Sequence, residues 1–86
     1  MHESQIARLN KIEGQIRGIK KMINDERYCV EILTQIRSAS KALAKVKYNI
    51  FQSHLEACVH DSLSGDDPSD RSKKIDEIIE LLSMFR

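Results

Sequence analysis

The sequence is poor in the residues that build β-rich folds. It has no tryptophan, two tyrosines and two phenylalanines, and only one proline and three glycines interrupt its 86 residues. This scarcity favours helices over a sheet with many tight turns, so we expect an all-α fold. A chain of this length makes one small domain, residues 1–86, and is too short for an enzyme core with a deep pocket.

Long hydrophobic runs are absent as well. No stretch approaches the roughly 20 apolar residues of a membrane-spanning helix, and the first ten residues, MHESQIARLN, lack the apolar core of a signal peptide. We therefore expect a cytoplasmic protein. In that reducing compartment two cysteines, Cys29 and Cys58, are more typical of metal binding or thiol reactivity than of a structural disulfide.

Charge is abundant but unevenly divided. Residues 1–50 carry ten Lys and Arg against five Asp and Glu, a net of +5, whereas residues 51–86 carry four against eight, a net of −4. The first half of the chain is therefore the half suited to an anionic partner.

Apolar residues recur at helical spacing in three segments. The first segment spans residues 4–24 and ends at NDER. The second begins near Tyr28 and meets no glycine or proline before Gly65, and Pro68 marks the start of the third. The apolar positions are Ile6, Leu9, Ile12, Ile16, Ile19 and Ile23 in the first, Leu33, Ile36, Leu43, Val46 and Ile50 in the second, and Ile75, Ile78, Ile79 and Leu82 in the third.

The second segment is too long for a monomer of this size. A helix of roughly 35 residues is about 50 Å long, and two short helices cannot cover it. We therefore expect three helices per protomer, with long central helices that pair antiparallel in a dimer. Gly14 and Gly18, four residues apart in the first helix, indicate either close helix packing or close approach of a ligand to the backbone.

The stretch SHLEAC contains the candidate metal ligands. His54 and Cys58 are four residues apart and share one helix face. Cys29 precedes His54 by twenty-five residues, or about 37 Å along the same helix, so the three cannot meet within one chain. In an antiparallel dimer Cys29 of one protomer can meet His54 and Cys58 of its partner. The plainer interpretation is a small buried thiol beside a hydrogen-bonded core histidine.

Two thiolates and one imidazole form a soft ligand set. It suits Cu(I), or Zn(II) if a fourth ligand joins, and suits Ni(II), Co(II) or Mg(II) poorly. His60 lies roughly 240° around the helix from His54, so we leave it outside the site.

Cations at helical spacing form a candidate DNA-binding surface, because phosphate contacts supply most non-specific affinity for DNA. Arg37, Lys41 and Lys45 make one stripe on the second helix. The alternative is an ordinary solvated face. No helix-turn-helix or zinc-finger pattern is present, so recognition through DNA shape and backbone is favoured. Further cations on the first helix are Arg8, Lys11, Arg17, Lys20 and Lys21.

These residues resemble the copper-sensing CsoR branch of the CsoR/RcnR/FrmR repressors. The resemblance extends from about Ile6 to Leu82 and includes the Cys29, His54 and Cys58 spacing and the stretches RYC, NKIEGQIRGI and QIRSASKAL. It implies an all-helical dimer that pairs into a tetramer, binds operator DNA when metal-free and is released by Cu(I). It also implies that the first cysteine comes from one protomer and the histidine and second cysteine from the other.

The resemblance assigns further roles. Tyr28 and Glu77 match residues that couple metal binding to DNA release, and Arg8 and Lys45 match basic residues needed for operator binding. Two positions depart from the family pattern. Lys45 stands where arginine is more common, and Glu13 is an acid where neutral or basic residues are frequent.

Three alternatives stay open on the sequence. A persulfide sensor of the same family would crosslink Cys29 and Cys58 across the dimer, although that branch generally lacks the histidine. A nickel, cobalt or formaldehyde sensor is favoured only by His2 and usually has a residue other than cysteine at position 58. A copper buffering or delivery protein would not need the basic stripe. No nucleophile–base pair or phosphate loop favours an enzyme.

Overall fold

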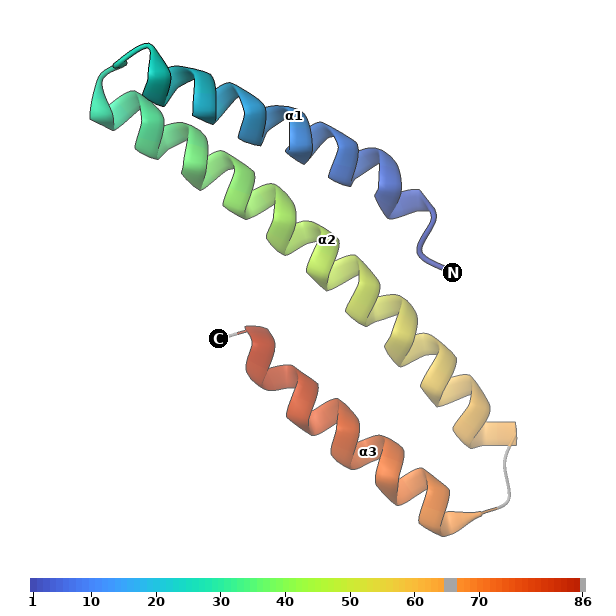
Figure 1. Ribbon diagram of the computed structural model, residues 1–86. Coiled ribbons are helices and arrows are strands. Elements are labelled where there is room, and N and C mark those ends of the chain that lie inside the picture. Colours follow the sequence, from blue (N-terminus) through green and yellow to red (C-terminus); the bar gives the residue numbers. More distant parts are fainter. Residues whose placement is uncertain (65–66, 86) are drawn as a thin grey trace. The chain divides into compact units, whose positions relative to one another are not determined.

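The computed structural model describes residues 1–64 and 67–85, and in these residues it is all-helical. The elements are α1 (Ser4–Asn24), α2 (Cys29–Ser64), α3 (Pro68–Leu82) and a short 3-10 helix, η1 (Ser83–Phe85) (Figure 1). The predicted all-α class, the boundaries of the first helix and the long central helix are confirmed. The stop signal predicted at Gly65 lies outside the described residues.

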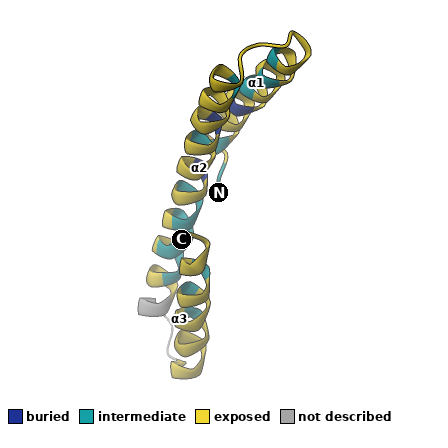
Figure 2. Ribbon diagram, turned by 90° about the vertical axis from the view of Figure 1, so that its left-hand side faces the viewer, coloured by how far each residue is buried: buried dark blue, intermediate teal, exposed yellow. Residues whose placement is uncertain are grey.

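The chain divides into two compact units, Met1–Phe51 and Gln52–Arg86. In the first unit α1 runs antiparallel to α2 (Figure 1), and the residues coloured as buried lie on these two helices (Figure 2). Ile12, Ala39 and Val46 are buried there. Asn49 donates a hydrogen bond of 3.1 Å from Nδ2 to Oε1 of Gln5, which joins the two helices beside their apolar contact.

The turn between α1 and α2 closes on a residue in the left-handed region. Glu26 has a φ of 53°. Its N–H donates to the carbonyl of Ile23 at 3.1 Å, and that of Arg27 donates to the carbonyl of Met22 at 3.0 Å. This is the Schellman pattern, in which glycine is preferred at the left-handed position. The α1–α2 turn therefore retains backbone strain at Glu26.

Replacing this residue by glycine should stabilise the protein. Glu26→Gly relieves a left-handed conformation that costs an L residue roughly 1–2 kcal/mol, against an entropy cost of roughly 0.5–1 kcal/mol for a glycine. We expect a small gain in stability, up to about 1 kcal/mol, and a midpoint of thermal unfolding a few degrees higher at fixed protomer concentration. Glu13→Gly, within α1, is the matched control and should lower the midpoint. An equal fall in both variants would contradict the prediction.

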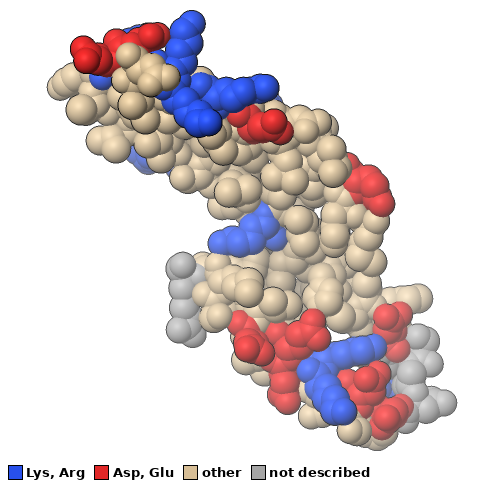
Figure 3. Space-filling view, viewed as in Figure 1, with Lys and Arg blue, Asp and Glu red and all other residues tan. Residues whose placement is uncertain are grey.

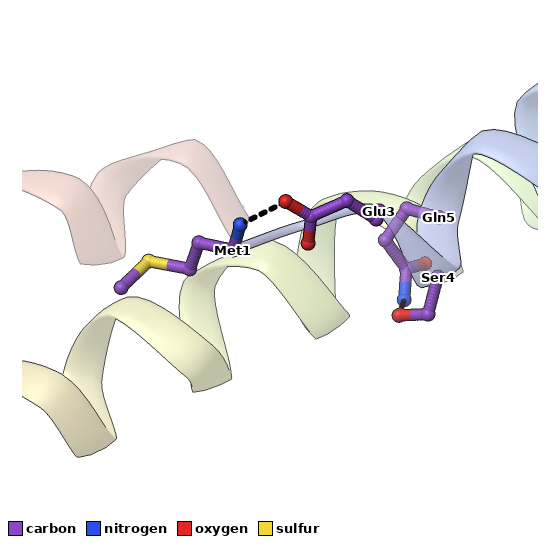
Figure 4. A network of polar contacts seen from close by, with 4 residues as sticks. All are labelled: Met1, Glu3, Ser4 and Gln5. Carbon is purple, nitrogen blue, oxygen red and sulfur yellow. Dashed lines mark hydrogen bonds and ion pairs between the residues drawn. The ribbon is translucent and has the colours of Figure 1, made fainter.

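The first helix begins without a side-chain cap. Glu3 occupies the N-cap position, but its carboxylate accepts a hydrogen bond from the ammonium group of Met1 instead of a backbone N–H of the first turn (Figure 4). This hydrogen bond lowers the pKa of the Glu3 carboxyl below its usual value. Gln5 also donates from Nε2 to the hydroxyl of Ser4 at 3.2 Å.

The third helix begins with a capped turn. The side chain of Asp67 accepts a hydrogen bond of 3.0 Å from the N–H of Ser69, and Pro68 occupies the first helical position. Asp70 adds a negative charge in the first turn, where the helix dipole favours it. The predicted start of this helix at Pro68 is confirmed, and its cap was not anticipated from the sequence.

Much apolar surface stays uncovered in a single chain. In the first unit, large apolar side chains of both helices are exposed, for example Leu33, which is 63% exposed, and Ile6, which is 56% exposed. In the second unit, Ile75, Ile79 and Leu82 are each more than half exposed. In the described part of the chain no helix is long and apolar enough to cross a membrane. Uncovered apolar area on this scale marks an interaction surface.

The two glycines of α1 do not serve packing between α1 and α2. A Cβ built on Gly18 would meet nothing within 4 Å, and one on Gly14 would meet only the end of the Arg17 side chain at 3.9 Å. Close packing of α1 on α2 is therefore not the reason for either glycine.

Candidate metal and nucleic-acid sites

Three polar side chains meet in the second unit. His54 and Cys58 lie on one face of α2, with Nε2 and Sγ 3.5 Å apart. Glu77 of α3 brings its Oε1 to 3.1 Å from the same Nε2. The His54 side chain is 37% exposed and that of Glu77 is 55% exposed, and Cys58 is half-buried. The pairing of His54 with Cys58 predicted from their spacing is therefore present.

The contact with Glu77 assigns different tasks to the two ring nitrogens of His54. A carboxylate only accepts, so Nε2 must carry the proton that it donates to Glu77. In the neutral ring the lone pair then lies on Nδ1, which is free to bind a metal ion. Metal-binding histidines commonly donate their other N–H to a carboxylate in this way. His54 and Cys58 thus supply one nitrogen and one sulfur donor on the same helix face, although the sulfur contact in this structure is to Nε2 and not to Nδ1.

The third predicted ligand belongs to the other unit. Cys29 is the first residue of α2 and is exposed. Tyr28, next to it, is 69% exposed, and its carbonyl accepts the first hydrogen bonds of the helix, from the N–H groups of Glu31 and Ile32. Among the described residues of one chain, no group of three His, Cys, Asp or Glu side chains is arranged to hold a metal ion. Within the second unit the predicted ligand set is partial, because His54 and Cys58 belong to that unit and Cys29 does not.

The arrangement around His54 does not form a nucleophile–base–orienter triad. In such a triad the imidazole contacts the nucleophile through one nitrogen and the carboxylate through the other. Here Cys58 and Glu77 both approach Nε2. The geometry therefore differs from that of a catalytic triad.

The predicted DNA-binding side chains lie in the first unit and are exposed. Figure 3 shows Lys and Arg side chains gathered over the second half of α1. Within the described residues no acidic side chain pairs with any cation of the α2 stripe. The exposed side chains predicted to bind DNA are Arg8 and Arg17 on α1 and Arg37, Lys41 and Lys45 on α2.

One neighbour of the stripe was not anticipated from the sequence. The ammonium of Lys45 lies 5.3 Å from the centroid of the Tyr48 ring, within the range of a cation–π contact. The spacing of three residues on a helix was the available signal, because side chains at i and i+3 are neighbours.

The sequence and the fold match known repressors. A family model described as metal-sensitive transcriptional repressor matches residues 1–84. The copper-sensing transcriptional repressor CsoR of Bacillus subtilis is 36% identical over 78 residues, which cover 91% of this chain and 74% of the relative.

Two solved structures share the fold. The copper-sensing repressor CsoR with Cu(I) from Geobacillus thermodenitrificans has a TM-score of 0.83 and 32% identity, covering 96% of this chain and 83% of that one. The nickel-responsive transcriptional regulator InrS has a TM-score of 0.84 and 30% identity, covering 98% and 91%. The match to the family model over almost the whole length and the shared helical fold place this chain in the family of metal-sensitive transcriptional repressors, to which it belongs.

Proposed function

We propose that the protein is a Cu(I)-responsive repressor that binds operator DNA in the metal-free state and leaves it when Cu(I) binds. The observation that carries the proposal is the meeting of His54 with Cys58 and Glu77, which presents a thiol and an oriented imidazole on one helix face. The match to copper-sensing CsoR of Bacillus subtilis supports the same metal. In this proposal the protein acts in the cytoplasm, where thiols stay reduced.

The site is completed by a second copy of the chain. The exposed apolar side chains of α1 and α2 need a partner, and long helices that pair antiparallel would cover them. Such a pairing brings Cys29 of one protomer to His54 and Cys58 of the other. Two of these dimers form the tetramer in this proposal.

The metal follows from the donor atoms. Two thiolates and one imidazole favour Cu(I), because soft sulfur ligands select this ion. A Ni(II) site prefers more nitrogen donors. The contact of His54 with Cys58 pairs one nitrogen donor with one sulfur donor, which favours Cu(I) over Ni(II) in this proposal. Bound Cu(I) would supply no redox step and would act as a structural crosslink between protomers.

The DNA contacts come from the first unit. Lys45 lies about 160° around α2 from the exposed apolar Leu43, so a partner that covers Leu43 leaves the Lys45 side open. Phosphate contacts by this stripe and by Arg8 and Arg17 supply affinity, and the shape of the DNA supplies specificity.

A DNA-binding titration with several inducers tests the function. The probe is a DNA duplex selected from a random-sequence pool by binding to the metal-free protein. Cu(I) should release this duplex at one equivalent per protomer, whereas Ni(II) should not. X-ray absorption of the copper form should show two sulfur ligands and one nitrogen or oxygen ligand. A spectrum without sulfur ligation would refute the copper site.

Removing single cations should weaken DNA binding, because each cation neutralises a phosphate. Arg8→Ala and Lys45→Ala should each lower DNA affinity and reduce the salt slope of log K by about one unit for each phosphate that is no longer neutralised. Lys73→Ala, which removes an exposed cation from α3, is the matched control and should leave the slope unchanged. Cu(I) affinity should be the same in all three variants. Normal DNA affinity in both test variants would show that DNA binds to a different face of the protein.

A persulfide sensor is the second candidate, favoured by the exposure of Cys29. Its thiolate can attack the outer sulfur of a persulfide donor, which releases the donor's thiol and leaves a persulfide on Cys29. A second donor equivalent would convert Cys58 of the partner protomer in the same way. Attack of the Cys29 persulfide on the Sγ of that Cys58 would then expel hydrosulfide and link the two residues through a trisulfide. This candidate predicts DNA release by a persulfide donor together with a covalent dimer that a reductant reverses. Release by Cu(I) alone, without a covalent dimer, would exclude it.

A further inference from the structure

Lys45 of the α2 stripe contacts a residue that is not a cation, Tyr48. The Lys45 ammonium lies 5.3 Å from the ring centroid of Tyr48. Tyr48 is 49% exposed, so the ring keeps an open face on the surface of α2. Around the helix it lies within about 20° of both Arg37 and Lys41. An exposed aromatic ring therefore stands among the three cations of the stripe.

A lysine side chain loses conformational entropy when its ammonium binds a DNA phosphate. Its side chain has a flexible four-carbon stem and about 2 kcal/mol of rotamer entropy, and its ammonium is a point charge without the planar fork of arginine. Ordering such a side chain on a phosphate lowers affinity. A ring that already attracts the ammonium restricts the stem before DNA arrives, and it leaves other N–H bonds of the ammonium free to donate.

We propose that Tyr48 is a positioning residue for DNA binding, whose ring holds the Lys45 ammonium where a DNA phosphate accepts its hydrogen bond. The proposal rests on the repressor function proposed above. The partner is the sugar–phosphate backbone, because an ammonium held by a ring face offers charge and N–H donors without a base-reading pattern. Tyr48 acts through Lys45, and its phenol hydroxyl is not required.

A double-mutant cycle with the full-length protein tests the coupling. The four proteins are the parent, Tyr48→Leu, Lys45→Ala and the double variant, and Tyr48→Phe is the matched control that keeps the ring and removes the hydroxyl. Fluorescence anisotropy measures binding of the selected duplex described above over a series of salt concentrations. Tyr48→Leu should weaken binding about two- to fivefold, the size of an exposed cation–π contact, and should lower the salt slope towards that of Lys45→Ala.

The effect of Tyr48→Leu in the Lys45→Ala protein shows whether Tyr48 acts through Lys45. Tyr48→Leu should cause no further loss of affinity in the Lys45→Ala protein, and Tyr48→Phe should bind as the parent does. In nuclear magnetic resonance spectra, the Lys45 ε-methylene protons should show an upfield ring-current shift that Tyr48→Phe keeps and Tyr48→Leu removes, a readout that does not depend on DNA.

Three results would overturn the inference. They are parent-like DNA affinity of Tyr48→Leu, an equal loss of affinity from Tyr48→Leu in both backgrounds, and the absence of the ring-current shift from the parent. If the parent binds DNA and Lys45→Ala weakens it while Tyr48→Leu does not, the inference fails and the repressor function stands. A parent that selects no duplex overturns both.

Discussion

Cys29→Ala should abolish tight Cu(I) binding. It removes one of two thiolates, and the remaining thiol–imidazole pair of His54 and Cys58 on a half-exposed helix face would hold the ion weakly. We expect the Cu(I) affinity to fall by more than about 100-fold, because removing only a hydrogen bond that supports a metal ligand can already cost that much. Competition with a Cu(I) chelator of known affinity measures the change. DNA affinity without copper should equal that of the parent.

Mixing two defective proteins tests whether the site is shared between protomers. Cys29→Ala and Cys58→Ala each lack a ligand at every site in their homodimers. A mixed dimer has one site that lacks both cysteines and one site that is complete, because its Cys29 and Cys58 come from different chains. Refolding the two variants together should therefore restore tight Cu(I) binding to a minority of sites. Absence of any restored binding in verified mixed dimers would show that the ligands come from a single chain.

The helices were predictable because their signals are local. Apolar spacing defined α1, and Pro68 marked the start of α3. The left-handed Glu26 was not predictable in the same way, since no glycine marks that turn. Its conformation depends on the two helix ends that the turn joins.

The candidate metal site was predictable to the extent that it follows helix geometry. The i, i+4 relation of His54 and Cys58 required only a continuous helix. The contact of Glu77 with His54 depends on how α3 packs on α2, and helix periodicity alone does not determine that packing. It was expected only by resemblance to a family. The contact of the Tyr48 ring with Lys45 was predictable from the sequence, because residues at i and i+3 of a helix are neighbours. It was not predicted, because only the charged residues of the stripe were considered.

We propose that His54 couples metal binding to DNA release. It sits on α2 and contacts α3 through Glu77, so a metal ion on its other nitrogen would fix the ring between the two helices. A ligand shifts an equilibrium only by its differential affinity for the two states. The thiolates can hold Cu(I) in either state, whereas the bond between His54 and Glu77 requires α3 to stay in place on α2. We therefore attribute affinity mainly to Cys29 and Cys58, and coupling to His54.

His54→Ala should then bind Cu(I) but no longer respond to it. In the parent, stoichiometric Cu(I) should weaken DNA binding by roughly 5- to 150-fold or more, the usual range of allosteric coupling, and in His54→Ala this ratio should fall close to one. The measurements are DNA affinity with and without one equivalent of Cu(I), and chelator competition to verify that copper stays bound. His60→Ala, which removes another histidine of the same helix on a different face, is the matched control and should keep the parent ratio. Glu77→Gln should give an intermediate ratio, because an amide still accepts the ring N–H without its charge. A His54→Ala protein that binds copper and releases DNA as the parent does would show that the coupling runs through the thiolates.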